Sequence, residues 1–210
     1  VHAIALILLT TLTPGWAQLV NPTVSDAKGN TAGGTDALDS LGPDTGNCGI
    51  TTGCNNTAFG ESALAGNSTG SSNTAFASFA LFNNNGEENT AIGLSALQNN
   101  TTGAFNTAIG VNALFSNITG GDSVAVGGNA LLNNTTGYQN TALGVQALFS
   151  NTVGIFNTAT GFGALTNNTI GIQNTATGRQ TLYRNISGTN NTASGYNALY
   201  SNTTGSSNTA

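Results

Sequence analysis

A seventeen-residue repeat runs from Asn56 to the end of the chain, with the pattern N-T-A-x-G-x-x-A-L-x-x-N-x-T-G-x-x. Its N-T-A signature or a variant recurs every 17 residues, apart from one interval of 16. A fixed period this short is typical of solenoids, in which each coil packs only on its neighbours. We number the repeat positions 1 to 17 from the first residue of the signature, which is Asn56, Asn73, Asn89, Asn106, Ser123, Asn140, Asn157, Asn174, Asn191 or Asn208.

Three repeat positions hold apolar residues of fixed size, which indicates a narrow, enclosed core. Position 3 is Ala, position 8 is Ala except at Thr181, and position 9 is Leu in every complete unit. Glycine at positions 5 and 15 suits two corners, and two short strands per coil would join them. The predicted core leucines are Leu64, Leu81, Leu97, Leu114, Leu131, Leu148, Leu165, Leu182 and Leu199.

The pattern therefore predicts an all-β fold, a parallel β-solenoid (β-roll or β-helix) of about ten 17-residue coils. At the usual strand spacing this makes a rod on the order of 45 Å long. Short helical turns at A-L-x-x-N are the alternative. They are disfavoured because apolar residues do not continue at i+3 and i+7, and because Gly or Asn interrupts each unit.

The chain divides into three segments. Residues 1–17 hold an apolar run and end in small residues, as a signal peptide does, although an apolar assembly segment donated to another subunit is the alternative. Residues 18–55 are expected to form an N-terminal cap, and residues 30–38 repeat the first nine positions as a degenerate first coil. Residues 56–210 are the repeat solenoid, with an incomplete last unit.

The two cysteines, Cys48 and Cys54, lie in the loop that separates the degenerate coil from the regular array. A disulfide between them would tie this loop and fits an extracellular destination, while two free thiols are the alternative. Two thiolates without a nearby histidine fall short of a zinc site, so we expect neither a metal nor a cofactor.

Position 12 is always asparagine. Six of the nine lie in N-x-S/T sequons and are candidate glycosylation sites: Asn67, Asn100, Asn117, Asn134, Asn185 and Asn202. Asn84, Asn151 and Asn168 keep the amide but lack the hydroxyl residue of the sequon. This favours a structural task for the amide, either a turn or a ladder of side-chain hydrogen bonds between coils, over a glycan as its main role.

Position 4 carries a row of apolar residues in the first six regular coils. If Ala at position 3 points inward, strand alternation turns position 4 outward, and a regular exposed row marks a subunit contact. The opposite orientation would leave a different row to bury, so self-association is expected either way. Position 10 carries further aromatic residues that a subunit contact would also have to shield from solvent. The predicted assembly face consists of Phe59, Phe76, Ile92, Ile109, Val126 and Leu143.

Charge is too sparse for several function classes. The chain has three basic and eight acidic residues among 210, with a formal net charge of −5. Because Lys28, Arg179 and Arg184 form no patch, no nucleic-acid partner is expected. The apolar run in residues 1–17 is too short to span a membrane. The sole histidine is His2, and the acids are not paired across repeats, so we predict that the chain is not an enzyme.

The runs N-T-A-I-G (106–110) and S-V-A-V-G (123–127) resemble the head repeats of trimeric autotransporter adhesins and related phage tail-fibre and surface fibre proteins. The resemblance covers residues 56–210 and extends to 30–38. It implies a left-handed parallel β-roll in which three chains associate. The unit of 17 residues is longer than that of the adhesins.

These features favour a secreted structural protein, extracellular or at the cell surface, that self-assembles into a fibre or appendage and carries glycans if the sequons are modified. Its partners would be copies of itself, in a homo-oligomer or a head-to-tail helical filament. An adhesin or tail-fibre head domain that binds a receptor or carbohydrate is the second hypothesis. An ice-binding solenoid is the third, because position 2 forms a threonine row that Val124 interrupts.

Overall fold

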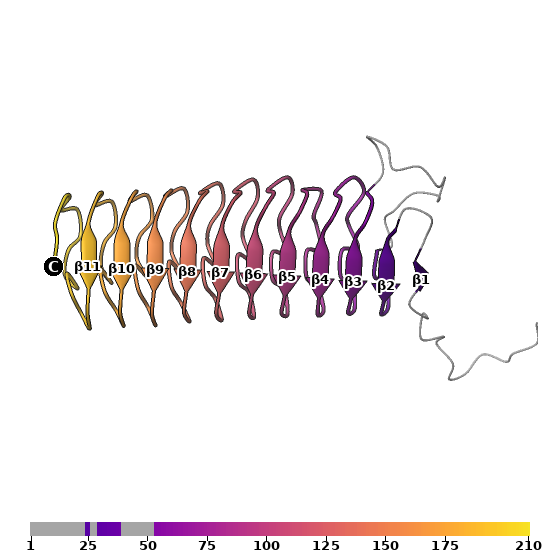
Figure 1. The fold of residues 1–210 in the computed structure, drawn as a ribbon, viewed down its shortest axis with the longest axis horizontal. Helices are drawn as coiled ribbons and strands as arrows, with labels where there is room; N and C mark the ends of the chain where they lie inside the picture. The colour runs from indigo at the N-terminus through magenta and orange to yellow at the C-terminus, as the bar shows by residue number, and fades with distance from the viewer. Residues whose placement is uncertain (1–23, 26–28, 39–52) are drawn as a thin grey trace, which may run out of the picture.

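The computed structural model describes residues 24–25, 29–38 and 53–210, which form a rod of stacked coils (Figure 1). Its sheet contains eleven strands in chain order, and β2 to β11 run parallel to one another. Only the pair of β1 with β2 is antiparallel. The strands are β1 Val24–Ser25, β2 Thr31–Gly33, β3 Thr57–Phe59, β4 Thr74–Phe76, β5 Thr90–Ile92, β6 Thr107–Ile109, β7 Val124–Val126, β8 Thr141–Leu143, β9 Thr158–Thr160, β10 Thr175–Thr177 and β11 Thr192–Ser194.

Each parallel strand occupies positions 2 to 4 and pairs with the same positions of the next coil. Ala108, for example, lies opposite Ala125, and Ala125 lies opposite Ala142. β2 pairs with β3 in this register as well, with Ala32 opposite Ala58, although 26 residues separate them. The predicted parallel β-solenoid with 17-residue coils is confirmed, and the strand at residues 31–33 stacks as its first rung.

The core is a column of small apolar side chains inside the coils. The alanines at positions 3 and 8 and the leucine at position 9 are fully buried in nearly every coil, as predicted. Leu64 to Leu182 have no exposed surface, whereas Leu199, in the last complete coil, is partly buried. Thr181 replaces one position-8 alanine, and its buried hydroxyl donates to the carbonyl of Gly195 at 2.5 Å.

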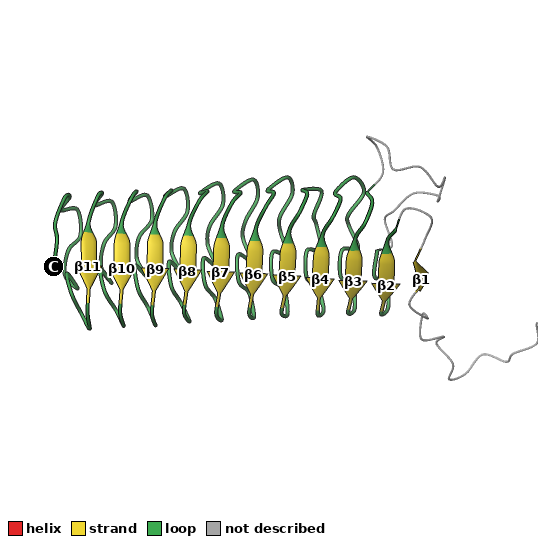
Figure 2. Cartoon of the chain, in the orientation of Figure 1, coloured by secondary structure: helices red, strands yellow, loops and turns green. Residues whose placement is uncertain are grey.

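The prediction of two strands per coil is wrong, because each coil contains one three-residue strand and otherwise turns (Figure 2). Successive side chains of a strand point to opposite faces. Ala113 and Leu114 are adjacent and both fully buried, which a second strand could not achieve. Instead the backbone at positions 7 and 9 is left-handed, with φ of 56° at Asn112 and 52° at Leu114.

Leucine rarely adopts the left-handed backbone conformation. Every position-9 leucine from Leu38 to Leu199 nevertheless has it, with φ between 50° and 57°. The conformation costs an L-residue about 1–2 kcal/mol. Burying a leucine side chain contributes about 1.5–3 kcal/mol. The backbone also remains bonded, because the Leu114 amide donates to the Ala130 carbonyl of the next coil at 3.0 Å. Burial and this hydrogen bond offset the strain.

The two conserved glycine positions of the repeat have different physical roles. Position 5 provides a positive φ, such as 134° at Gly110, so its predicted role at a corner is confirmed. Position 15 does not need a positive φ, which corrects the prediction for the second corner. A Cβ on Gly120 would instead collide with the Gly137 carbonyl and lie 2.5 Å from Asn117 Oδ1. Glycine at position 15 therefore permits close approach between coils.

The single sixteen-residue coil, which begins at Asn73, uses a side chain to replace the missing residue. In regular coils the position-13 amide donates to a backbone carbonyl of the next coil, as Ile118 does to Thr135 at 2.9 Å. The Ser68 amide donates instead to the side-chain Oδ1 of Asn85, also at 2.9 Å. The shortened coil thus keeps the inter-coil bonding intact.

We predict opposite outcomes for alanine at two glycines of neighbouring coils. Gly120→Ala should lower the free energy of unfolding by about 2–3 kcal/mol, because the added methyl overpacks against the next coil. Gly128→Ala should leave stability unchanged or slightly raised, since a Cβ there meets nothing within 4 Å. Urea unfolding followed by circular dichroism measures both, and equal effects of the two substitutions would contradict this role of position 15.

Candidate functional site

The asparagines of position 12 form a continuous ladder along the rod, which confirms the predicted asparagine ladder. Each Nδ2 donates to Oδ1 of the asparagine in the preceding coil, over 2.7 Å from Asn117 to Asn100 and 2.8 Å from Asn134 to Asn117. The same ladder includes the three asparagines without sequons, Asn84, Asn151 and Asn168. Those three are fully buried.

A second ladder runs along position 1 and is joined to the first by glycine carbonyls. The backbone amide and the Nδ2 of Asn106 both donate to Oδ1 of Asn89, at 3.0 and 3.1 Å. Its Nδ2 also donates to the carbonyl of Gly120 at 2.9 Å, and Asn117 Nδ2 donates to the same oxygen at 2.8 Å. The position-15 carbonyl therefore links the two ladders within a coil where position 1 is asparagine.

Ser123 interrupts the position-1 ladder. Its amide still donates to Asn106 Oδ1, and its hydroxyl accepts the Asn140 amide at 3.2 Å. Serine has no side-chain amide that could donate to the position-15 carbonyl of its own coil. Among the ladder side chains, only Asn134 Nδ2 therefore donates to the Gly137 carbonyl. Elsewhere the ladders are satisfied, and within the described residues only Asn197 Oδ1 is a buried side-chain polar atom without a partner.

Burial argues against glycosylation at the predicted sites. Asn67, Asn100, Asn117, Asn134 and Asn185 have no exposed surface, and their Nδ2 atoms donate to glycine carbonyls. In all of them except Asn67, the Nδ2 atom also donates to the asparagine of the preceding coil. A glycan is attached through this same nitrogen. Modification would displace the ladder and open the coil. Asn202, in the last complete coil, is half-buried but bonded in the same way.

Cys54 is buried and disulfide-bonded. Cys48, the one other cysteine of the sequence, lies outside the described residues, as do residues 1–17 with their predicted signal peptide. The position-1 ladder already includes Asn30, whose Oδ1 accepts from the Asn56 amide at 2.8 Å, and the position-12 ladder begins at Asn67.

The predicted assembly face lies outside the coil, because position 3 is buried and position 4 is its outward neighbour. Phe76, Ile92, Ile109 and Leu143 are 38–45% exposed. Phe59 and Val126 are half-buried. Phe59 and Phe76 stack with ring centroids 4.9 Å apart. The row ends at β8, because β9 to β11 carry Thr or Ser at this position.

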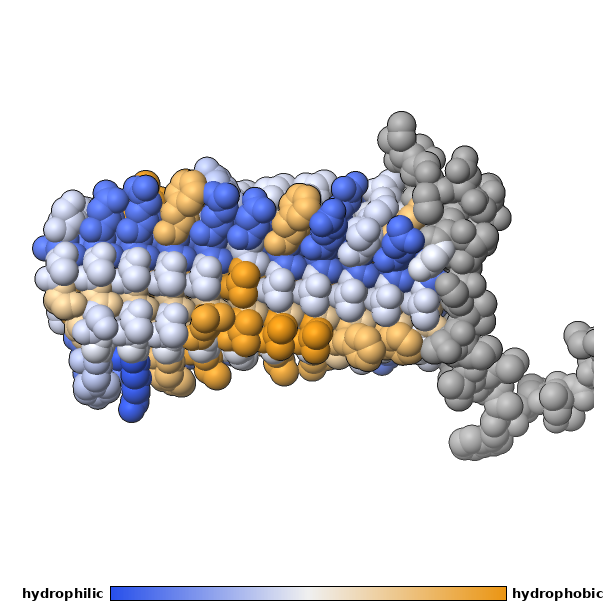
Figure 3. All heavy atoms as spheres, in the orientation of Figure 1, coloured by the Kyte–Doolittle hydropathy of each residue, from blue (hydrophilic) through white to orange (hydrophobic). Residues whose placement is uncertain are grey.

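A second apolar row at position 6, which the sequence analysis missed, flanks the first. Leu94, Val111, Val145 and Phe162 are 46–50% exposed. We call the two rows together the apolar stripe: Phe59, Phe76, Ile92, Ile109, Val126 and Leu143 at position 4, with Leu94, Val111, Val145 and Phe162 at position 6. Figure 3 shows it as the orange band over β3 to β8. Variation at position 6 hid this row, since no single residue type recurs there.

The other candidate rows are less exposed or shorter. The aromatic residues at position 10 are half-buried. The threonine row at position 2 is half-buried from Thr57 to Thr158, and β9 and β10 add a second outward threonine at Thr160 and Thr177. Two hydroxyl rows therefore run together over only a few coils.

Among the described residues, no cluster of three His, Cys, Asp or Glu residues could hold a metal ion. No helix in the described part is long and apolar enough to cross a bilayer. The remaining charges are scattered, with Arg179 placed over the rings of Phe162 and Tyr196 at 5.7 and 5.8 Å.

Comparison with known proteins finds no match to this chain among family models, curated proteins or solved structures.

We predict that the ladder, and not a glycan, is what Asn117 contributes. Asn117→Ala should lower the free energy of unfolding by about 3 kcal/mol, because Asn100 Oδ1 and Asn134 Nδ2 lose buried partners. The control Thr119→Ala removes the sequon and leaves the ladder, and it should be neutral. Both are measured by denaturation of protein secreted from a glycosylating host. Equal destabilisation of the Asn117→Ala and Thr119→Ala variants would contradict the prediction, because both lack the sequon and only the first lacks the ladder contacts.

We also predict that completing the interrupted ladder stabilises the rod. Ser123→Asn should raise the free energy of unfolding by about 1 kcal/mol, because the new amide can bond to Asn106 Oδ1 and the Gly137 carbonyl. Thermal unfolding of the variant beside the parent protein measures the gain. No change, or a loss, would mean that this coil cannot accept the ladder geometry.

Proposed function

We propose that this chain is a structural segment of a secreted protein that self-assembles into an extracellular fibre or surface appendage. The apolar stripe is the observation that carries the proposal. Ten exposed or half-buried apolar side chains in two adjacent rows exceed the scattered apolar residues of an ordinary soluble surface. A stripe of this length, roughly 29 Å at the usual strand spacing, suits contact along a second rod.

Rigidity supports the same proposal. Association is more favourable when the contacting side chains are already held in place, because less conformational freedom is lost. The strands that carry the stripe are bonded coil to coil, and the position-1 asparagine immediately before each of β5 and β6 belongs to a ladder. The stripe is thus presented on a preorganised surface, as a structural component requires.

The disulfide at Cys54 supports an extracellular location, because disulfides persist in oxidising compartments. The resemblance of the repeats to the heads of trimeric autotransporter adhesins and phage tail fibres supports a surface fibre. Within this proposal the partners are other copies of the chain, and the segment has no catalytic role.

An adhesin or tail-fibre head that binds a carbohydrate is the second candidate. One observation favours it: Tyr138 and Phe156 are 41% and 44% exposed, with their rings edge to face at 5.4 Å, on turns away from the stripe. Exposed aromatic faces are suited to contact with the apolar faces of sugars. Binding of the soluble protein to a glycan array, lost on Tyr138→Ala, would favour this candidate over a purely structural role.

We predict that assembly depends on the stripe and not on exposed apolar residues in general. Ile109→Asp should abolish or strongly weaken self-association, because a carboxylate in the contact would lose its hydration. Ile118→Asp is the matched control, with 43% exposure against 38% at Ile109 but a place outside the stripe. Sedimentation velocity and negative-stain microscopy measure the assemblies. A monomeric parent protein at high concentration, or equal loss in both variants, would overturn the proposal.

A further inference from the structure

The residues at repeat position 6, which we call row 6, change from acidic to apolar to basic along the rod; row 4 is the row at position 4. Row 6 reads Glu61, Ser78, Leu94, Val111, Gly128, Val145, Phe162, Arg179 and Tyr196 from the first regular coil to the ninth. An acidic residue therefore stands near one end, apolar residues fill the middle and a basic residue stands near the other end. Glu61 and Arg179 are both exposed.

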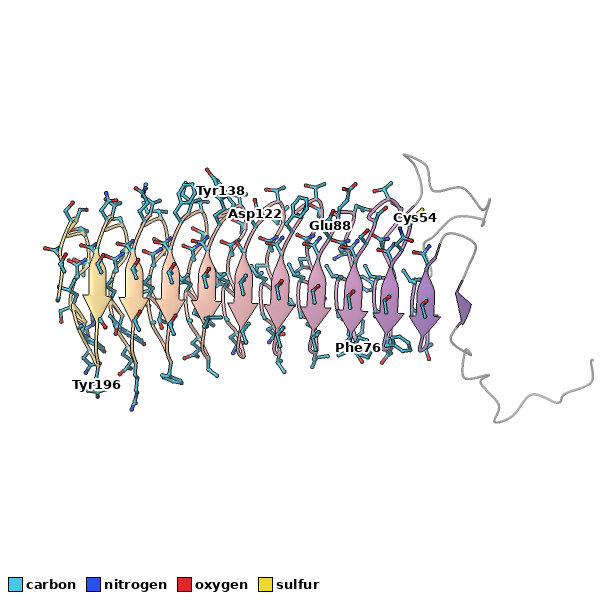
Figure 4. All side chains as sticks on the ribbon, viewed as in Figure 1. Cys54, Phe76, Glu88, Asp122, Tyr138 and Tyr196 are labelled. Carbon is cyan, nitrogen blue, oxygen red and sulfur yellow. The ribbon has the colours of Figure 1, made fainter. Side chains whose placement is uncertain are left out.

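These two are the only charged residues at positions 4 and 6 of the described coils. They are seven coils apart, roughly 34 Å, which is too far for them to pair within one chain. Glu88 and Asp122 lie on the opposite long edge of the rod from Phe76 and Tyr196 (Figure 4). The face that carries the stripe thus presents one charge of each sign, Glu61 near one end and Arg179 near the other.

Two rods in face-to-face contact can be related by a two-fold axis in two ways. With the axis parallel to the rods, the chains are parallel and row 4 of one faces row 6 of the other. Glu61 would then face the partner's Phe59, and Arg179 would face the partner's Thr177. Neither charge would gain an opposite charge in that arrangement.

With the axis perpendicular to the rods, the chains are antiparallel and like rows face each other with the coil order reversed. One register brings Glu61 opposite the partner's Arg179, and the symmetry repeats the pair at the other end. The axis then passes between the coils of Val111 and Gly128. In row 4 the same register sets Ile109 opposite the partner's Val126, and Ile92 opposite the partner's Leu143.

This register also matches the shape of row 6. Val111 comes to lie opposite the partner's Gly128, where a Cβ would meet nothing within 4 Å. The open position can receive the valine side chain. Leu94 lies opposite the partner's Val145. Arg179 is already held over Phe162 and Tyr196 of its own row, so less side-chain freedom is lost when it pairs.

We propose that the stripe binds a second copy of this chain in antiparallel orientation, with two Glu61–Arg179 pairs at the ends of a central apolar contact. The inference rests on the proposed function, and the dimer would be the lateral unit of the fibre. Complementary charges at the rim of an interface fix register and orientation.

A charge exchange tests the pairing. Glu61→Arg and Arg179→Glu should each weaken dimerisation by about tenfold in sedimentation equilibrium at low salt, because like charges would meet at both ends. The double variant should recover the affinity of the parent protein. Both positions are exposed, and circular dichroism checks that each variant folds. Singly substituted proteins that dimerise as the parent does, or a double variant as weak as the singles, would overturn the register.

Crosslinking tests the orientation independently. A mixture of Leu94→Cys and Val145→Cys proteins should be joined by a bis-maleimide shorter than three coil spacings, about 14 Å, whereas neither protein should be joined to itself. A mixture of Leu94→Cys and Ile92→Cys proteins would be joined instead in the parallel pair. That result would overturn the antiparallel inference and leave self-assembly standing, whereas a monomeric parent protein would overturn both.

Discussion

Buried amides that must all be hydrogen-bonded fix the architecture of this rod. An asparagine with no exposed surface has two donors and an acceptor to satisfy, and an orphaned group costs about 1–3 kcal/mol. Asn117 meets this demand through Asn100, Asn134 and Gly120 only when adjacent coils are in register. A shift of one residue would orphan amides in every coil. The ladders thus specify the register between coils, much as a buried polar residue specifies register in a coiled coil.

Much of the fold could be predicted from the sequence because each coil repeats the same environment. The invariant Ala, Leu and Asn positions identify the core and the ladder before any coordinate is known. The winding of the coil could not be predicted, because it depends on Leu114 and its equivalents adopting a left-handed backbone that leucine rarely chooses. Neighbouring coils impose that conformation through burial and hydrogen bonds, and local propensity carries no sign of it.

The surface was harder to predict than the interior for a related reason. A core position admits one residue type, whereas an exposed position tolerates many, so Leu94, Val111 and Phe162 share a row without sharing a residue. The row becomes visible only when the coils are stacked. At position 15 the recurring residue type was visible, but its role was predicted wrongly. The glycine suggested a turn, whereas a side chain is excluded there by the carbonyl of the next coil, as at Gly120 and Gly137.

The coil that begins at Ser123 concentrates the departures from the repeat. It has serine in place of the ladder asparagine, valine in place of the outward threonine and glycine at position 6. In a solenoid, stability is a sum over coils and their interfaces, so a weaker ladder here weakens the two junctions that this coil makes. The proposed two-fold axis passes beside the same coil. Contacts with a second rod would therefore stabilise the coil whose own ladder has the fewest hydrogen bonds. Assembly would in this way raise the free energy of unfolding of the rod.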